Sequence, residues 1–484
     1  MVDFAQIPAG LRIPGMYVEF DASLAGQAQQ SFKRLIIGQR LAAGSIAEGA
    51  PVRITSASQA ETYFGRGSQL ATMLQAALKV DPWMDTRAIA LDDNGAGAVA
   101  TGSVAFTGTS TRAGTLNLYI GGQRVQAGVA AAMTATDLGA AIAAAINADT
   151  TLPVTATATT GTVTLTARHA GECGNDIDIR LNYYGEDTPA GVAAALTAMS
   201  GGAGNPDIAT AIAAMGDEWF NWIAMPYTDA ANLTALEAEL DDRYSATRQM
   251  GGRAFAAISG SHATALTFGS GRNSPHIAML GLQGSPTQPA IVAALLSAVA
   301  SKALALDPAR PLQTLALSGM LAPASTDRWT DTERNLALFD GISTFKVLPD
   351  GSCHLERVIT MYQLNAGGID DTAYLDINTP ETLERHRYNV RGEIGLRYPR
   401  HKLAGDAQPL RPGQALARPK DIRATLLSVY EREVRDGWME DLEGYKASLY
   451  VEIDPNDPNR VNVADQPNLV NQLRIVADLV QFKV

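Results

Sequence analysis

Apolar positions in the middle of the chain alternate between two patterns. Short apolar runs bounded by Gly, Pro or polar residues are typical of buried strands, and they occur at 34–38, 88–91, 219–226, 253–259 and 276–282. Between them lie segments whose apolar residues recur at helical spacing, such as Leu70, Met73, Leu74 and Ala77. Alternating strands and helices predict a parallel or mixed sheet with helices on both faces. The expected fold class is therefore α/β, or α+β when the whole chain is counted.

Residues 94–204 interrupt this alternation with a sequence rich in Thr, Ala and Gly and poor in aromatic residues. Strands are expected at 102–109, 116–120, 154–159, 162–168 and 177–183. A helix is expected after Thr134-Ala-Thr-Asp137, which resembles a capping box. Turn-forming sequences, Asp92-Asp-Asn-Gly95 and Gly201-Gly-Ala-Gly204, bracket the segment. The pattern predicts a β-rich domain inserted into a loop of the core.

The chain changes character again past Tyr374. Pro419 opens an expected helix that ends at Gly437, and 447–453 is expected to be a strand. The predicted organisation is an N-terminal arm (1–30), a discontinuous α/β core (31–93 and 205–362), the inserted domain (94–204), a C-terminal domain (363–472) and a terminal strand (473–484).

The terminal strand is the most distinctive segment. Residues 473–484 lack Gly and Pro and are rich in β-branched and apolar residues, as strands are. Alternation puts Leu473, Ile475 and Leu479 on one face and Val476, Val480 and Phe482 on the other. A strand with two apolar faces needs partners on both sides. It can pair within its own domain or with an edge strand of a neighbouring copy.

The N-terminal arm contains a matching feature. After Ile13-Pro14-Gly15, the apolar residues Met16, Val18 and Phe20 alternate with polar positions, which predicts a short strand at 16–21. Residues 23–31 show no strong period and are expected to be a tether. A chain with a pairing strand on an arm at each end is suited to a polymer in which each subunit pairs its terminal strands with neighbouring copies.

Composition sets broad limits. The 484 residues are 46% hydrophobic and 18% charged, which is typical of a globular chain. Two cysteines, Cys173 and Cys353, provide no disulfide framework and fit a reducing compartment. We expect neither an export signal nor a membrane span, and therefore synthesis in a cytoplasm.

Charge is distributed unevenly. Residues 385–423 contain ten basic and three acidic side chains, a net +7, which leaves −19 for the rest of a chain of net charge −12. Nucleic-acid binding is not expected, because no recognised module or stacking platform accompanies these residues. A basic face that meets an acidic protein surface fits better.

Catalytic and metal-binding motifs are weak. There is no phosphate-binding Gly-x-x-x-x-Gly-Lys-Ser/Thr, no Cys-x-x-Cys and no His-Glu-x-x-His. His354 and Glu356 share a strand face, but two ligands do not make a zinc site. Asp454 and Asp457 are typical of a turn. We therefore expect no metal and no cofactor.

Asp229, His262 and Ser301 occur in the order of one known catalytic triad, which raises the alternative of a hydrolase. Ser301 lies inside an Ala/Leu-rich helix, whereas a nucleophile needs an exposed turn with an oxyanion hole. Ser285 is better placed but lacks the flanking residues of such a site. These observations favour a structural role over an enzyme.

Several segments together resemble a known family. They are Ile13-Pro14-Gly15-Met-Tyr-Val-Glu19, Arg34-Leu-Ile-Ile-Gly38, Gly49-Ala-Pro51-Val-Arg-Ile54-Thr-Ser56, Tyr63-Phe-Gly65, Asn335-Leu-Ala-Leu-Phe-Asp-Gly-Ile342, Arg357-Val-Ile-Thr360 and Tyr398-Pro-Arg-His-Lys-Leu403. In order and spacing the chain resembles contractile-tail sheath proteins, those of Mu-like bacteriophages in particular. The similarity covers most of the chain outside 94–204.

The resemblance implies a core of subtilisin-like topology without protease activity. It also implies a structural subunit of the virion tail sheath that is assembled in the host bacterial cytoplasm. Its partners would be other copies of itself in stacked hexameric rings, the tail tube protein, and baseplate and tail terminator proteins. Contraction would drive the tube through the host envelope for genome delivery, with no nucleic acid or membrane contact by this subunit.

By the same resemblance, strands 16–21 and 473–484 are exchanged between neighbours and the inserted domain points outward. Basic residues of the C-terminal domain would face the tube, and they correspond here to Lys420, Arg423, Arg432 and Arg435. Two alternatives remain at this stage: another tail or baseplate structural protein, and a cytoplasmic α/β hydrolase or ligand-binding protein whose termini pair within its own sheet.

Overall fold

The computed structural model describes residues 31–409, 411 and 414–483. The predicted arm strand at 16–21, with Met16, Val18 and Phe20, lies outside these residues. The described chain forms two compact units, one of residues 32–384 and 469–483 and the other of residues 385–468. They are described separately.

The larger unit is built on an eight-stranded sheet in the order β15-β14-β13-β12-β11-β1-β3-β2. Its strands are β1 (Lys33–Gln39), β2 (Val52–Ile54), β3 (Asp85–Leu91), β11 (Trp222–Ala224), β12 (Arg253–Ser259), β13 (Ile277–Leu282), β14 (Ile342–Val347) and β15 (Cys353–Arg357). The six inner strands are mutually parallel, while the edge strands β2 and β15 run antiparallel to their neighbours. The expected mixed sheet is confirmed.

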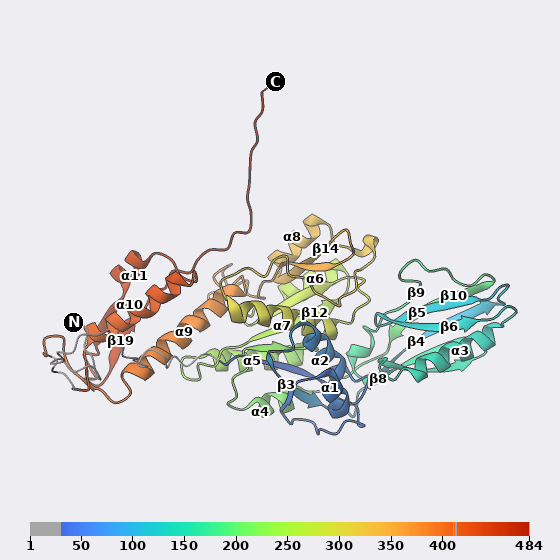
Figure 1. The fold of residues 1–484 in the computed structure, drawn as a ribbon, viewed down its shortest axis with the longest axis horizontal. Helices are drawn as coiled ribbons and strands as arrows, with labels where there is room; N and C mark the ends of the chain where they lie inside the picture. Colours follow the sequence, from blue (N-terminus) through green and yellow to red (C-terminus); the bar gives the residue numbers. More distant parts are fainter. Residues whose placement is uncertain (1–30, 410, 412–413, 484) are drawn as a thin grey trace, which may run out of the picture. The chain divides into compact units, whose positions relative to one another are not determined.

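Helices cover both faces of this sheet, because alternate strand residues point to opposite sides (Figure 1). Leu35 and Ile37 of β1 pack with α4, α5 and α8, whereas Ile36 packs with α1, α2 and α7. The bounds of the helices are α1 (Ala57–Phe64), α2 (Gln69–Val80), α4 (Ala209–Met215), α5 (Ala230–Tyr244), α6 (His262–Ser270), α7 (Pro289–Leu306) and α8 (Asp331–Phe339). Ser56, Ser68 and Asp229 cap α1, α2 and α5, and each accepts a backbone N–H at the helix start.

One of these helices, α7, passes a test of length and hydropathy for a membrane span, with a mean hydropathy of 1.9 over 18 residues. The sequence prediction missed this run. In the structure 72% of it is buried, because it packs on β11 and β12 as a core helix. The apolar sequence is thus explained by contact with the sheet.

Residues 94–204 form sheets of their own (Figure 1). One has the order β10-β4-β8-β7 and the other β6-β5-β9, with α3 (Ala135–Ala148) packed on both. The strands are β4 (Val99–Gly108), β5 (Gly114–Ile120), β6 (Gln123–Val129), β7 (Val154–Thr159), β8 (Thr162–Ala170), β9 (Ile179–Leu181) and β10 (Val192–Ser200). The prediction omitted β6 and β10, whose small and polar residues give little apolar signal.

A buried polar network attaches these sheets to the core. His169 of β8 bonds Asp93 through Nδ1 at 2.8 Å, and its Nε2 accepts the N–H of Gln69 at the start of α2. Gln39 at the end of β1 donates to Asp93 and to the carbonyl of Ala170. Because each bond joins residues that are distant in sequence, the network fixes where the insertion leaves and re-enters the core.

The smaller unit contains most of α9 (Asn378–Arg397), together with α10 (Pro419–Arg435), α11 (Leu442–Ser448) and the short pairs β16 (Lys402–Leu403) with β17 (Leu416–Ala417) and β18 (Tyr450–Ile453) with β19 (Val461–Ala464). The sequence prediction missed α9 entirely. Among its buried positions are polar residues, Thr382, Glu384 and His386, so no apolar period marks the helix. The strand predicted at 447–453 begins only at Tyr450, since α11 extends to Ser448.

The sequence predicts a hairpin in which a strand at 352–362 pairs with one at 343–348, but the second strand, β15, ends at Arg357. The terminal strand predicted at 473–484 is not a strand in the single chain. Its residues up to Lys483 are extended, and none pairs with another strand (Figure 1). A β-strand needs hydrogen-bonded neighbouring strands, and no strand among residues 31–409, 411 and 414–483 pairs with this segment.

Candidate functional site

The clearest candidate site is the exposed apolar segment 473–483. Six of its side chains are between 71% and 83% exposed: Leu473, Ile475, Val476, Leu479, Val480 and Phe482. Soluble proteins seldom expose so many apolar residues in sequence, and such patches mark interaction sites. The predicted pairing residues therefore lie together on one extended segment.

The root of this segment is held firmly although its tip is not. The guanidinium of Arg474 donates to Asp376 at 2.9 Å, and Asp376 also accepts two bonds from Arg357, at 3.0 and 2.9 Å. Gln313 donates to the carbonyl of Leu473, and Gln472 donates to the carbonyl of Ala309. Charge-assisted bonds of this kind fix direction as well as position. The segment consequently leaves the larger unit at a defined point.

A second feature is the β18–β19 ribbon. Its register pairs Val451 with Val463 and Ile453 with Val461, so all four apolar side chains lie on one face. None is fully buried, and Val463 is 43% exposed. A two-stranded ribbon is marginally stable by itself. β18 also packs against α10, and neither strand of the ribbon pairs with a third strand among the described residues.

The basic residues predicted to face a tube, Lys420, Arg423, Arg432 and Arg435, all lie on α10. Because a helix turns about 100° per residue, Arg423 and Arg432 point to opposite sides, whereas Lys420 and Arg435 lie about 60° apart. Arg423 donates to the carbonyls of Leu449 and Lys446, and Arg432 lies 3.8 Å from Glu393. Lys420 and Arg435 are the exposed pair. The four residues thus do not form a single face.

The residues tested for a catalytic triad are not brought together. The Ser301 hydroxyl is fully buried, donates to the carbonyl of Ala298 and accepts a bond from Arg34. His262 Nε2 bonds the carbonyl of Glu333, and Asp229 caps α5. Ser285, the other candidate, donates to the carbonyl of Leu321. Each side chain has a local structural partner instead of a catalytic one.

The metal candidates also have structural roles. His354 bonds the carbonyl of Thr314 and the hydroxyl of Ser352, while Glu356 pairs with an arginine and a lysine. Asp454 accepts the N–H groups of Asn456 and Asp457, as expected for a turn. Among residues 31–409, 411 and 414–483, no group of three or more His, Cys, Asp or Glu side chains is arranged to hold a metal ion.

One arrangement resembles a Cys–His–Asp site and was missed by sequence analysis. Cys173 donates to Gln39, which also bonds Asp93, the partner of His169. Burial, together with the Asp93 and Asp176 carboxylates, raises the pKa of the Cys173 thiol to about 12. A nucleophilic cysteine needs a lowered pKa, so this network is suited to holding the inserted domain and not to catalysis.

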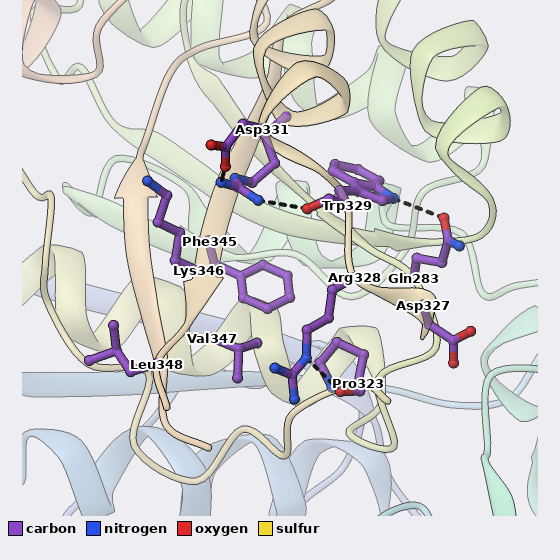
Figure 2. A pocket seen from close by; sticks show the side chains of 12 residues that line it. Gln283, Pro323, Asp327, Arg328, Trp329, Asp331, Phe345, Lys346, Val347 and Leu348 are labelled. Carbon is purple, nitrogen blue, oxygen red and sulfur yellow. Dashed lines mark hydrogen bonds and ion pairs between the residues drawn. The ribbon is translucent and has the colours of Figure 1, made fainter. Parts of the chain in front are cut away.

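A pocket of about 330 Å³ opens where β14 diverges from β13 (Figure 2). Figure 2 shows its side chains coming from the end of β13, the loop before α8, and β14. The pocket contains apolar residues such as Trp329 and Phe345, but no Ser, Cys or His that could act as a nucleophile or base. Arg334 pairs with Asp331 and Glu356, and Lys346 pairs with Glu356. Its charged groups are largely occupied by one another.

Two protein-family models match parts of this chain. Residues 201–361 match the phage tail sheath protein central domain, and residues 370–483 match the phage tail sheath C-terminal domain. The chain is 42% identical over 484 residues to the Mu-like prophage FluMu tail sheath protein of Haemophilus influenzae, covering 99% of both chains.

Solved structures are similar at lower identity. The sheath tail protein of Desulfitobacterium hafniense is 12% identical with a TM-score of 0.47, covering 94% of this chain and 100% of that one. The sheath tail protein of Listeria innocua is 13% identical with a TM-score of 0.49, covering 93% and 95%. A chain of the anti-feeding prophage baseplate is 12% identical with a TM-score of 0.46, covering 98% and 100%.

The identity to a curated tail sheath protein over nearly the full length of both chains, and the two family matches, show that this chain belongs to the phage tail sheath family.

Proposed function

We propose that this chain polymerises into stacked hexameric rings around a tail tube, with neighbouring subunits linked by exchanged strands. The observation that carries the proposal is the anchored but unpaired segment 473–483, with its six exposed apolar side chains. A segment with a fixed root and an apolar, extended tip is suited to pair with another molecule by β-augmentation. The N-terminal strand 16–21 is the second strand of the proposed exchange.

The β18–β19 ribbon is the proposed acceptor. Each added strand would satisfy the backbone groups at an open edge and cover the half-buried face formed by Val451, Val463, Ile453 and Val461. The ribbon can accept further strands, and the segment is a strand without a sheet to join. Pairing of the segment of one copy with the ribbon of another would complete both.

The exchanged strands also suggest how contraction proceeds. The eight-stranded core with its covering helices is densely packed and moves as a rigid body. The extended segment beyond Arg474 acts as the hinge that keeps subunits connected while their cores rotate. Contraction spreads from the baseplate and drives the tube through the host envelope for genome delivery.

The tube-facing role is proposed for α10. Lys420 and Arg435 are exposed near opposite ends of α10, about 22 Å apart along the helix axis, so each can reach an acidic partner directly. Arg423 and Arg432, with their internal partners, would support this face by fixing α10. Baseplate and tail terminator proteins are the further proposed partners, with assembly in the host bacterial cytoplasm.

The test compares the full-length chain with a version that ends at Asn471. A third variant, Val476→Ser/Val480→Ser/Phe482→Ser, keeps the chain length but removes one apolar face. We expect long hollow cylinders by negative-stain microscopy, and strong light scattering, only from the full-length chain. The triple-serine variant should have the same far-UV circular dichroism as the full-length chain, because its three changed side chains are exposed in the single chain. The version that ends at Asn471 also loses the bond from Arg474 to Asp376, so the serine variant is the one that isolates the apolar face.

Equal polymerisation of all three chains would show that the segment does not link subunits. If the full-length chain stays monomeric at high concentration while segment 473–483 is ordered, this chain does not polymerise by itself and the proposal fails.

A further inference from the structure

The smaller unit contains a buried charged cluster that the tail-sheath assignment does not explain. His386 of α9 is 6% exposed, and both of its ring nitrogens contact carboxylates. Nδ1 lies 2.6 Å from Glu433 of α10, which is fully buried, and Nε2 lies 3.0 Å from Asp465, just after β19. One ring therefore joins two helices to the end of the ribbon.

The geometry requires a positively charged ring. Neutral imidazole has one donor and one acceptor nitrogen, so it could donate to only one of the two carboxylates. Its lone pair would then face the other carboxylate. Burial alone opposes the charge, but the hydrogen bonds to Asp465 and Glu433 and their negative charges outweigh it and raise the pKa of His386 to about 9. The folded ring thus binds its proton about 300-fold more tightly than a free histidine.

The groups around His386 maintain the positive charge of its ring. Asn389 of α9 donates to the second oxygen of Glu433 at 2.8 Å, which orients that carboxylate. Tyr445 of α11 stacks on Tyr430 of α10 at 3.6 Å between ring centroids and adjoins Asp465. Burial and the Asp465 carboxylate raise the pKa of the Tyr445 hydroxyl, so it stays protonated. Neither tyrosine can supply the positive charge that the two carboxylates need.

The position of Asp465 connects the cluster to the β18–β19 ribbon. Asp465 follows directly after Ala464, the last residue of β19. A short segment beyond it, Asn468 accepts the N–H of Glu440 and a bond from the hydroxyl of Tyr430. When His386 loses its proton, one of its two bonds is lost, so the attachment of α9 to Glu433 of α10 or to Asp465 after β19 is weakened, while the bonds between Asn468 and Tyr430 remain.

We propose that His386 is a charged latch that positions the β18–β19 ribbon to receive strands from neighbouring copies, so that assembly fails when the ring is deprotonated. The proposal rests on the proposed role of the ribbon as acceptor. Because the pKa of His386 is raised in the fold, the latch is complete below about pH 6.5 and is lost as pH rises through about 9. His386 is a positioning residue in this account, since it acts through Asp465.

The experiment measures two properties of full-length chains as pH rises from 7 to 10. The first is hydrogen exchange of the ribbon amides in dilute monomer, and the second is the yield of cylinders at high concentration. The variant is His386→Gln, which can occupy the site but cannot carry the charge. His401→Gln is the matched control, because His401 is exposed in the same unit and contacts only the Tyr398 ring among the contacts described.

At pH 7 we expect ribbon amides of His386→Gln to exchange at least 10-fold faster than those of the wild type, and cylinders to be lost. The difference in exchange should disappear by pH 10, where about a tenth of the wild-type rings remain protonated. His401→Gln should behave as the wild type throughout. Selective ¹³C labelling of histidine should show one ring, absent from the His386→Gln spectrum, that titrates near pH 9.

Three results would overturn the latch: a ring that titrates near 6.5, an exchange difference of the same size at pH 7 and 10, or no difference at either pH. Faster exchange with normal cylinders from His386→Gln would overturn its link to assembly. If no chain forms cylinders at any pH while the exchange and titration behave as expected, the latch stands and the proposed polymer fails.

Discussion

The sharpest test of strand exchange is the single change Phe482→Ala. Phe482 is 81% exposed in the single chain, so truncating it removes almost no intramolecular contact. Burying a phenylalanine side chain in a neighbour would contribute about 2 kcal/mol. Since about 1.4 kcal/mol is a factor of ten in an equilibrium constant, the critical concentration for polymerisation should rise about 30-fold. The monomer should keep its thermal midpoint, with stability unchanged to within about 0.5 kcal/mol.

Phe339→Ala is the matched control, because Phe339 on α8 is 74% exposed but lies outside the segment. The assay is pelleting of polymer over a concentration series, checked by negative-stain microscopy, with thermal unfolding measured on the monomer. For the control we expect a critical concentration within about two-fold of the wild type. An unchanged critical concentration for Phe482→Ala, or equal increases for both variants, would refute the reasoning.

Three further predictions follow from the larger unit. Replacing Asp376 with Ala leaves two half-buried arginines without their shared carboxylate. The monomer should lose roughly 2 kcal/mol in thermal unfolding, and limited proteolysis should cut near residue 474 faster. Because the pKa of Cys173 is raised to about 12 and that of Cys353 to about 11, both thiols should resist Ellman's reagent at pH 8 until the chain unfolds; fast reaction in the native state would contradict this. A chain with residues 95–203 replaced by a short Gly/Ser linker should fold with the eight-stranded sheet intact by circular dichroism and still form cylinders, and loss of folding would show that the core depends on the insertion.

Local sequence predicted much of the larger unit because its elements follow local rules. Strand β1 is a continuous apolar run since both of its faces are covered by helices. The sequence predicts Ser68 as a cap, because capping depends on residues three positions apart, but it offers both Ser56 and Ser58 for the preceding helix, and the structure shows that Ser56 is the cap. The family was predicted from the order of short motifs along the chain. Composition and the spacing of apolar residues could not have identified it.

The smaller unit was poorly predicted because its helices are held by polar contacts. The hydrophobic period of α9 is weak, since His386 and Glu384 occupy buried positions that an apolar residue would usually fill. Glu433 looks like a solvent-exposed residue in the sequence, and only the fold brings it within 2.6 Å of His386. Likewise, Arg423 was assigned to a binding face, whereas the structure uses its guanidinium on carbonyls at the end of α11.

The terminal segment, residues 473–484, separates what the sequence determines from what only the tertiary structure determines. Sequence alone determined that residues 473–484 favour an extended strand with two apolar faces, because alternation and β-propensity are local properties. Whether that strand has a partner depends on which edges and faces the rest of the chain leaves open. Only the tertiary structure decided that the root is anchored through Arg474, that no strand of the described residues pairs with the segment, and that β18–β19 has no third strand among those residues.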